Sequence, residues 1–173
     1  IDPRRIVFRR VLDMNDRTLR SIIAAVQALD RGLDRIPLRT PAPGASVTSG
    51  FGARTDPFLG RAAFHAGVDF EEGYGETVKA TAAGQVTVAA PTGGYGNMVE
   101  IDHGGGLTTR YGHLSSIAVS PGQAVRLGTT LGRVGSTGRS TGPHLHYETR
   151  VHGEAVDPFR FLNAGRMLAA AGR

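Results

Sequence analysis

Two different patterns of hydrophobic positions divide the chain. In the first 40 residues, apolar side chains recur in alternating steps of three and four, at Leu19, Ile22, Val26, Leu29, Leu33 and Ile36. This spacing predicts an amphipathic helix and matches the a and d positions of a heptad. Asn15 or Asp16 can cap the start of this helix, and Pro37 is expected to end it. The helix can pack on its own domain or form the end of a coiled coil, and the pattern fits both.

After the turn-forming stretch "PAPG" at residues 41–44, the pattern changes to short apolar alternations interrupted by glycine, as in "GQVTVAA", "NMVEIDH" and "HLHYETRV". Such segments, with turns at short intervals, are typical of an all-β sandwich or barrel. The last stretch, "DPFRFLNAGRMLAAAGR", predicts a short C-terminal helix. We therefore predict an N-terminal helical segment and linker in residues 1–40 and a mainly β domain in residues 41–173.

The composition fits this division and excludes several kinds of site. The 25 glycines favour a domain rich in tight turns, and the absence of Cys excludes disulfides and thiolate metal ligands. The longest apolar runs are far too short to cross a membrane, and no phosphate-binding glycine loop opens a helix. Because the chain begins at Ile1 rather than Met, we expect a fragment from which a targeting or anchoring segment has been removed.

The formal net charge of +5 is concentrated in one part of the chain. Residues 1–40 hold nine Arg against five acidic residues, whereas residues 41–173 hold eleven basic against ten acidic residues. A nucleic-acid surface needs a clustered basic face with stacking aromatics, and aromatic residues make up only 6% of this chain. We therefore predict that the protein binds no nucleic acid.

Histidines supply the candidate chemistry, beginning with "GPHLHYE" at residues 142–148. On a strand, His144 and His146 point to the same face, about 6.6 Å apart, while Leu145 and Tyr147 point to the other face. Two imidazoles directed into one space suit a metal ion, or one metal ligand beside one group that transfers protons. A chance H-x-H is not rare, so the pair needs support from other motifs.

A second motif, "FHAGVDF", contains His65 and Asp69, which would lie about 13 Å apart on a straight strand. A bulge or bend at Gly67 could close that gap, and imidazole nitrogen with carboxylate oxygen suits Zn²⁺. Three protein ligands with one open position would define a catalytic zinc site. A third motif, "RYGHLS", places His113 on or beside another strand, where it could orient water or stabilise an oxyanion.

Each of these residues also has an ordinary structural interpretation. His65 could be a loop residue, Asp69 a turn carboxylate, and His113 a half-buried residue of the sheet. His103 and His152 stand beside turn glycines and are expected to be polar turn residues.

Taken together, the motifs from Ser49 onward resemble those of the lysostaphin-type (LytM-domain) zinc metalloendopeptidases of bacterial cell walls. The resemblance covers nearly all of residues 44–162. Four segments carry it, in the order found in the family: "SGFGARTDPF", "FHAGVDF", "GGYGNMVEIDHGGGLTTRYGHLS" and "LGRVGSTGRSTGPHLHYE". The resemblance implies an antiparallel β-sandwich or open barrel-like catalytic domain of the lysostaphin/LytM type.

Carried over by position, the resemblance makes His65, Asp69 and His146 the ligands of one Zn²⁺ ion. His144 and His113 become the catalytic histidines, and which of them transfers the proton and which stabilises the oxyanion stays open.

Three further residues have two interpretations each. Arg54 matches an arginine common in the family, which can contact a substrate carboxylate or form an ordinary salt bridge. Tyr95 and Tyr111 can line the substrate groove or pack across strands.

The function implied is a zinc-dependent endopeptidase that hydrolyses peptide cross-links of bacterial peptidoglycan. The alternative is a catalytically silent or autoinhibited scaffold that activates a cell-wall amidase. In the autoinhibited form, Asn15 or a residue of the linker "RIPLRTPAP" would occupy the open metal position.

The expected location is the periplasm of a Gram-negative bacterium. The composition of nineteen Arg and one Lys suggests a GC-rich genome, and the helical prefix suggests an envelope protein. The full-length protein is expected to be anchored in the inner membrane upstream of Ile1, and residues 1–40 could mediate coiled-coil self-association or bind a divisome or envelope partner.

Overall fold

The computed structural model describes residues 32–55 and 60–171, and it divides the chain into two compact units, Ile1–Leu33 and Asp34–Arg173. Of the first unit only Gly32 and Leu33 are described, and both are helical. The rest of the predicted helix and its two candidate caps lie outside the described residues. Ile36, assigned above to the apolar seam, lies in a bend beyond the helix, so the helix ends before Pro37. Among the described residues, no helix is long and apolar enough to span a membrane.

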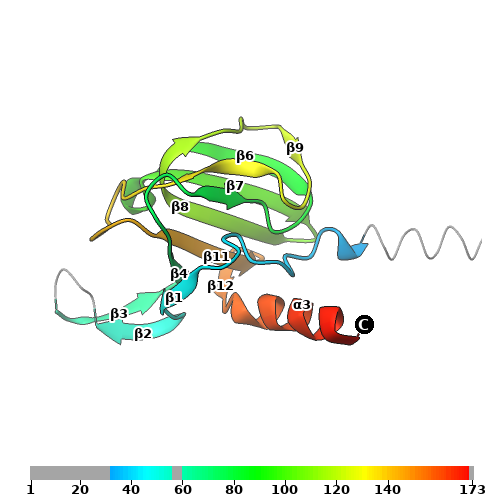
Figure 1. Ribbon diagram of the computed structural model, residues 1–173, viewed down its shortest axis with the longest axis horizontal. Coiled ribbons are helices and arrows are strands. Elements are labelled where there is room, and N and C mark those ends of the chain that lie inside the picture. Colours follow the sequence, from blue (N-terminus) through cyan, green and yellow to red (C-terminus); the bar gives the residue numbers. More distant parts are fainter. Residues whose placement is uncertain (1–31, 56–59, 172–173) are drawn as a thin grey trace, which may run out of the picture. The chain divides into compact units, whose positions relative to one another are not determined.

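The described residues of the second unit form twelve antiparallel strands and a C-terminal helix (Figure 1). The strands are β1 (Ser46–Ser49), β2 (Gly52–Thr55), β3 (Ala62–His65), β4 (Val68–Glu71), β5 (Thr77–Lys79), β6 (Gly84–Pro91), β7 (Asn97–Gly104), β8 (Leu107–Ile117), β9 (Ala124–Val125), β10 (Thr130–Val134), β11 (Leu145–Val151) and β12 (Glu154–Val156). A 3₁₀ turn, η1 (Gly93–Tyr95), links β6 to β7, and the helix is α3 (Phe159–Ala171).

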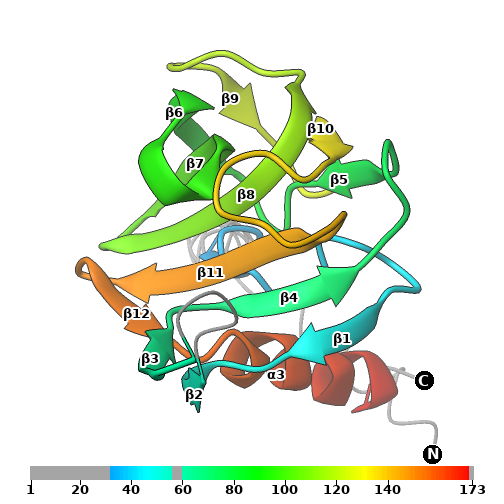
Figure 2. The same ribbon diagram turned by 90° about the vertical axis from the view of Figure 1, so that its left-hand side faces the viewer.

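Ten of these strands belong to one sheet with the order β1-β4-β11-β8-β7-β6-β9 (Figure 2). Off this path, β10 pairs with both β8 and β5, and β12 pairs with β11. Strands β2 and β3 form a separate two-stranded ribbon. Residues from β4, β5, β6, β7, β8, β10 and β11 meet in a single buried cluster, as expected when a sheet folds over on itself. The prediction of a mainly β, antiparallel sandwich or open barrel is confirmed.

Strand β11 has two different faces, as the alternation in "HLHYE" predicts. Leu145 and Tyr147 are fully buried on the core side. His146 and Glu148 project to the opposite face, where the pocket described below is found. The strand therefore supports the core with one set of side chains and the candidate site with the other.

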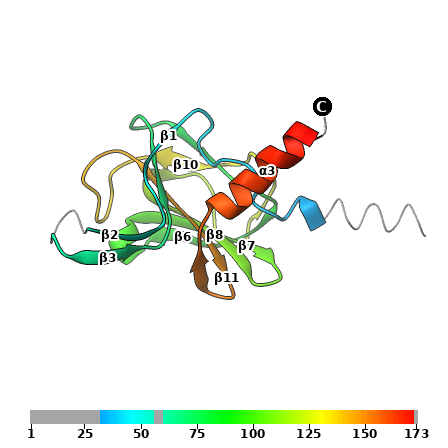
Figure 3. The same cartoon turned by 90° about the horizontal axis from the view of Figure 1, so that it is seen from below.

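The C-terminal helix α3 is present as predicted and lies along the β11–β12 side of the sheet (Figures 1 and 3). Gly165 of α3 packs directly on the backbone of Leu38, where any side chain at position 165 would clash. The carbonyl oxygen of Asp34 accepts a hydrogen bond from the amide of Ala83, just before β6, at 2.7 Å, and that of Pro41 accepts one from the amide of Lys79 in β5 at 3.1 Å. Residues 34–43, which include the predicted linker, are therefore built into the β unit, and Ala42 belongs to its core.

Candidate metal centre and active site

The first two candidate residues, His65 and Asp69, are brought together by a bend. His65 ends β3 and Asp69 lies in β4, and these strands belong to different sheets. The bend falls at Gly67. A Cβ at this position would come within 2.3 Å of the carbonyl oxygen of Tyr147, so only glycine fits without displacing β11. The distance from His65 Nε2 to Asp69 Oδ1 is 3.1 Å, far below the separation expected on a straight strand.

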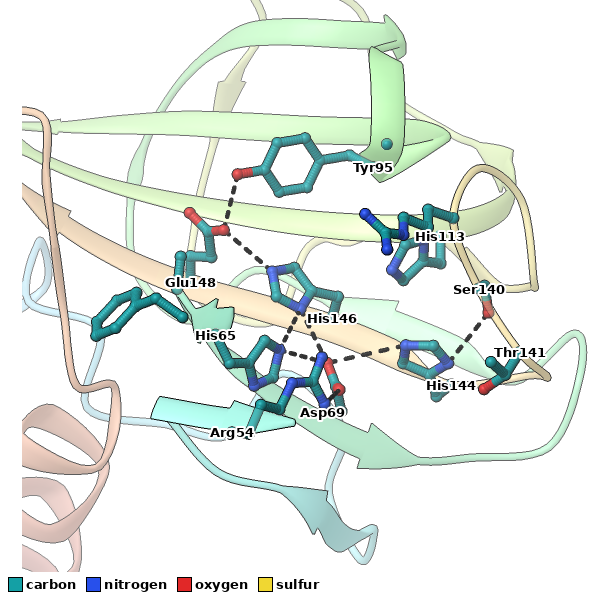
Figure 4. Close-up of a pocket in the computed structure, with 14 residues that line it drawn as sticks. Arg54, His65, Asp69, Tyr95, His113, Ser140, Thr141, His144, His146 and Glu148 are labelled. Atoms are coloured by element: carbon teal, nitrogen blue, oxygen red, sulfur yellow. Dashed lines mark hydrogen bonds and ion pairs between the residues drawn. The ribbon is translucent and has the colours of Figure 1, made fainter. Parts of the chain in front are cut away.

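The third candidate, His146, comes from the neighbouring strand. In the antiparallel pairing of β11 with β4, His146 lies directly opposite Asp69. Its Nδ1 atom is 2.8 Å from Asp69 Oδ1 and 3.1 Å from His65 Nε2. One potential ligand atom from each of the three residues lies within 4.8 Å of the others, and all three residues are buried. Figure 4 shows their side chains converging on one point.

The other ring nitrogen of each histidine has its own acceptor. His65 Nδ1 donates to the carbonyl oxygen of Gly50 at 2.7 Å, and His146 Nε2 donates to Glu148 Oε1 at 3.0 Å. In the neutral rings, these bonds leave the lone pairs on His65 Nε2 and His146 Nδ1, the two nitrogens nearest Asp69 Oδ1. Metal-binding histidines are held in this way in proteins. When either nitrogen carries a proton, it donates that proton to Asp69 instead. Two nitrogens and one carboxylate oxygen are a donor set that suits Zn²⁺, so the residues present fit such an ion.

The electrostatics of the cluster couple His146 to two carboxylates. Burial would raise the pKa of the Asp69 carboxyl, but hydrogen bonds from His146 and His65 bring it below its usual range. Burial would lower the pKa of His146, but its hydrogen bonds to Asp69 and Glu148 raise it above the ordinary value. Burial would raise the pKa of Glu148, but the hydrogen bonds from His146, Tyr95 and Arg150 together lower it. Both carboxylates are therefore ionised at neutral pH.

The two candidate catalytic histidines lie beside this cluster, with ring centroids 4.7 Å apart. His113 Nδ1 donates to the carbonyl oxygen of Thr137 at 2.8 Å, and His144 Nδ1 donates to that of Gly142 at 2.8 Å. In the neutral form each ring therefore keeps its proton on Nδ1 and offers the lone pair of Nε2. His144 Nε2 lies 3.8 Å from Asp69 Oδ1. Burial lowers the pKa of His113 to about 4, which keeps this ring neutral at physiological pH.

All five candidates line one pocket of about 280 Å³ (Figure 4). Tyr95 and Phe64, which is 64% exposed, also line it. A second hollow continues from the first along β1 and β4 as far as Glu71 and Pro143. The two share the following wall residues: Arg54, Asp69, Thr141 and His144. The candidate centre therefore lies in an elongated groove that can hold an extended chain.

Residues 63–158 match the model of peptidase family M23, and this range contains all five candidates. The chain belongs to peptidase family M23. Among curated relatives, it is 47% identical over 112 residues to the DD-carboxypeptidase/endopeptidase Mpg of Neisseria meningitidis serogroup B, an alignment that covers 65% of this chain and 26% of the relative. The chain thus spans about a quarter of the length of that curated relative.

Solved structures agree with this assignment. A zinc-containing peptidase from Vibrio cholerae is 38% identical with a TM-score of 0.65, covering 70% of this chain and 38% of that one. The catalytic domain of the antimicrobial peptidase lysostaphin from Staphylococcus simulans is 34% identical with a TM-score of 0.64, covering 69% of this chain and 92% of that one. The resemblance to lysostaphin-type peptidases stated from the motifs is confirmed.

Arg54, Tyr95 and Tyr111, which each had two interpretations, lie at different places in the structure. Arg54 lies at the pocket, with its NH1 atom 2.6 Å from Ser49 Oγ and 3.5 Å from Asp69 Oδ2. Tyr95 lines the pocket, whereas Tyr111 is fully buried in the core and packs against Tyr147 at 5.3 Å between ring centroids. Of the two interpretations for Tyr111, cross-strand packing is therefore correct.

The two remaining histidines, His152 and His103, differ in how far they are exposed. His152 is an exposed turn residue with a positive φ of 50°, as expected. His103 is only 1% exposed, so its interpretation as a polar turn residue is wrong. Its ring bridges the carbonyl oxygen of Ala83 and the hydroxyl of Thr109, and this pair of hydrogen bonds is what allows an imidazole to be buried there.

Glu148 is the site residue that the sequence reasoning missed. It follows His144 and His146 on the same face of β11, so the alternation that paired the two histidines could have included it. A single Glu at this spacing gives no signal that it is buried, so the sequence does not distinguish it from an ordinary strand residue. It is 1% exposed and holds His146 through the hydrogen bond described above.

Replacing Gly67 with Ala tests the bend that assembles the cluster. The new methyl group would force β11 away from β4, so we expect a lower melting temperature and weaker Zn²⁺ binding by the folded variant. Gly50→Ala is the matched control, because Gly50 also contacts a candidate ligand but has open space at its Cβ position. Calorimetry and Zn²⁺ titration measure both effects, and equal behaviour of the two variants would contradict this role of Gly67.

Proposed function

We propose that this chain is a zinc-dependent endopeptidase that hydrolyses peptide cross-links of bacterial peptidoglycan, with His65, Asp69 and His146 as the metal ligands. The observation that carries the proposal is the convergence of His65 Nε2, Asp69 Oδ1 and His146 Nδ1 within 4.8 Å. Membership of peptidase family M23 and the zinc-containing structural neighbour from Vibrio cholerae support it.

The roles of the protein's own residues follow from their hydrogen bonds. A bound Zn²⁺ ion supplies Lewis-acid chemistry, polarising the scissile carbonyl and lowering the pKa of water. His113 and His144 are the proposed catalytic residues, since each ring in its neutral form presents the lone pair of Nε2, which can accept a proton from the attacking water. The ring that has taken up a proton can then donate it to the leaving amine or hydrogen-bond to the oxyanion. The backbone carbonyls of Thr137 and Gly142 fix both tautomers.

The groove and the relatives support the proposed substrate. An extended peptide fits a groove that runs from Phe64 across the centre towards Glu71. The Neisseria relative is named a DD-carboxypeptidase/endopeptidase, so we propose a bond between D-amino acids of the peptidoglycan peptides as the one cleaved. Because peptidoglycan lies in the cell envelope, the proposed substrate implies that the protein acts there. The Gram-negative periplasm, an anchor upstream of Ile1 and a partner bound through residues 1–40 stay predictions.

The presence of every proposed metal ligand and catalytic histidine argues against a silent scaffold that activates an amidase. All three proposed ligands and both histidines are present, and they are held in one pocket. None of residues 35–43 lines the pocket, so the linker "RIPLRTPAP" does not block it. Asn15, the other candidate for a blocking residue, lies outside the described residues.

Incubation with purified muropeptides of defined cross-link type tests the function directly. We expect dimeric muropeptides to be converted to monomers at the peptide cross-link, as read by mass spectrometry. A chelator should abolish the conversion, and added Zn²⁺ should restore it. Intact dimers after incubation with the zinc-loaded protein would contradict the proposal, and amidase stimulation by the same sample would then favour the scaffold.

Two alanine substitutions separate the proposed ligand from the proposed catalytic residue. His146→Ala removes a metal ligand and should lower the bound zinc well below one ion per chain. His144→Ala should leave the zinc content unchanged and lower the cleavage rate by about 10²–10⁴-fold, the usual contribution of a general acid or base. Elemental analysis and cleavage of sacculi measure the two quantities. Full zinc content in His146→Ala, or wild-type cleavage by His144→Ala, would refute the corresponding role.

Metal binding should also depend on pH through His146. Its pKa is raised, so in the metal-free protein a proton occupies the ring to a higher pH than in a free histidine. Zn²⁺ needs the Nδ1 lone pair and must displace that proton, so affinity should fall as the pH drops through and below neutrality. Calorimetric titrations in buffers of different ionisation enthalpy count the released protons. An apparent enthalpy independent of the buffer at pH 7 would contradict this prediction.

A further inference from the structure

One buried carboxylate joins the candidate centre to the wall of the groove. Glu148 Oε1 accepts hydrogen bonds from His146 Nε2 at 3.0 Å and from the Tyr95 hydroxyl at 2.8 Å, and Oε2 accepts one from Arg150 NH1 at 2.5 Å. The side chain is 1% exposed, so protein groups take the place of water around it. Figure 4 shows Glu148 between His146 and Tyr95.

The charge of Glu148 is balanced on the side away from the centre. Arg150 forms the close ion pair, and Arg110 NH1 lies 4.0 Å from Oε2. Arg110 also lies over the Tyr95 ring, 5.6 Å from its centroid, and bonds Glu100 at 2.6 Å. A buried carboxylate with this many donors accepts only, so the bond to His146 must be donated by Nε2–H. In the neutral His146 ring, the lone pair is therefore on Nδ1, the atom that faces Asp69 and His65.

We propose that Glu148 is a positioning residue that sets the affinity of the centre for its metal, and that Tyr95 and Arg150 hold it in place. The inference rests on the proposed metal site. Glu148 fixes the ring of His146 in orientation and tautomer and increases the electron density on Nδ1. Carboxylates that accept from metal-bound histidines act in this way, and their loss typically costs about 10–100-fold in metal affinity.

Glu148→Gln is the informative substitution, because the amide keeps the shape of the side chain. In either orientation its NH₂ group faces a donor, Arg150 in one case and His146 with Tyr95 in the other. We expect the affinity for Zn²⁺, measured by competition with a chromophoric chelator, to fall by about 10–100-fold. Because a donor then faces a donor in a buried site, the metal-free variant should also melt at a lower temperature than the wild type. The affinity is therefore measured well below that temperature, where the variant is folded, so that loss of folding does not account for the change.

Glu100→Gln is the matched control. The same chemical change is made on a carboxylate that bonds Arg110, in the same network, but contacts neither His146 nor Tyr95. Its Zn²⁺ affinity should equal that of the wild type. Tyr95→Phe removes one of the three donors to Glu148 and keeps the ring, so its affinity should fall less than that of Glu148→Gln. Wild-type affinity in Glu148→Gln, or an equal loss in Glu100→Gln, would overturn the proposal.

Should Glu148→Gln fail to fold, Glu148→Asp replaces it. The shorter side chain keeps the charge for Arg150 but draws the carboxylate away from His146, so a folded variant with reduced affinity is expected. Wild-type affinity in that variant would overturn the proposal equally. The assay needs no substrate, so it is distinct from the test of function. If the wild type binds no Zn²⁺, the proposed metal site itself fails; if it binds and Glu148 variants bind as well, only the present inference fails.

Discussion

The antiparallel pairing of β4 with β11 is the constraint on which the site depends. It sets Asp69 opposite His146, and the pairing of β11 with β8 sets Gly112 opposite the same histidine. Side chains alternate with a period of two, so a slip of one residue would turn Leu145 and Tyr147 towards the groove and bury His146 in the core. The full burial of Leu145 and Tyr147 makes that slip costly. The core therefore fixes the register, and the register fixes the donor atoms.

Burying so many polar groups behind a groove requires that each has a partner. Among the described residues, no buried side-chain nitrogen or oxygen lacks a hydrogen bond. Around His146 this is achieved by two carboxylate acceptors, Asp69 on one side of the ring and Glu148 on the other. Hydrogen bonds between protein groups thus hold the arrangement. Preorganisation of this kind is what metal centres and active sites require.

Local patterns in the sequence predicted the parts of the site that depend on local geometry. The shared face of His144 and His146 follows from the period of a strand, and the bend between His65 and Asp69 follows from Gly67. The motif order, rather than any spacing, is the basis for the prediction that His113 is catalytic. What could not be predicted depends on contacts between distant segments. Tyr95 reaches Glu148 across 53 positions, and the burial of His103 depends on Ala83, so no local pattern reveals either.

The proposed catalytic residue His113 and the proposed metal ligands are positioned in different ways. Strand register places Asp69 and His146, whereas His113 adopts a left-handed backbone with φ of 61° inside β8. For a residue other than glycine this conformation costs about 1–3 kcal/mol and persists only when its surroundings enforce it. Thr137 supplies that enforcement, since its carbonyl binds the His113 ring and its hydroxyl binds the carbonyl of Leu114. Changes in the loop around Thr137 can therefore alter the proposed proton transfer by His113 while the sheet keeps the proposed metal ligands in place.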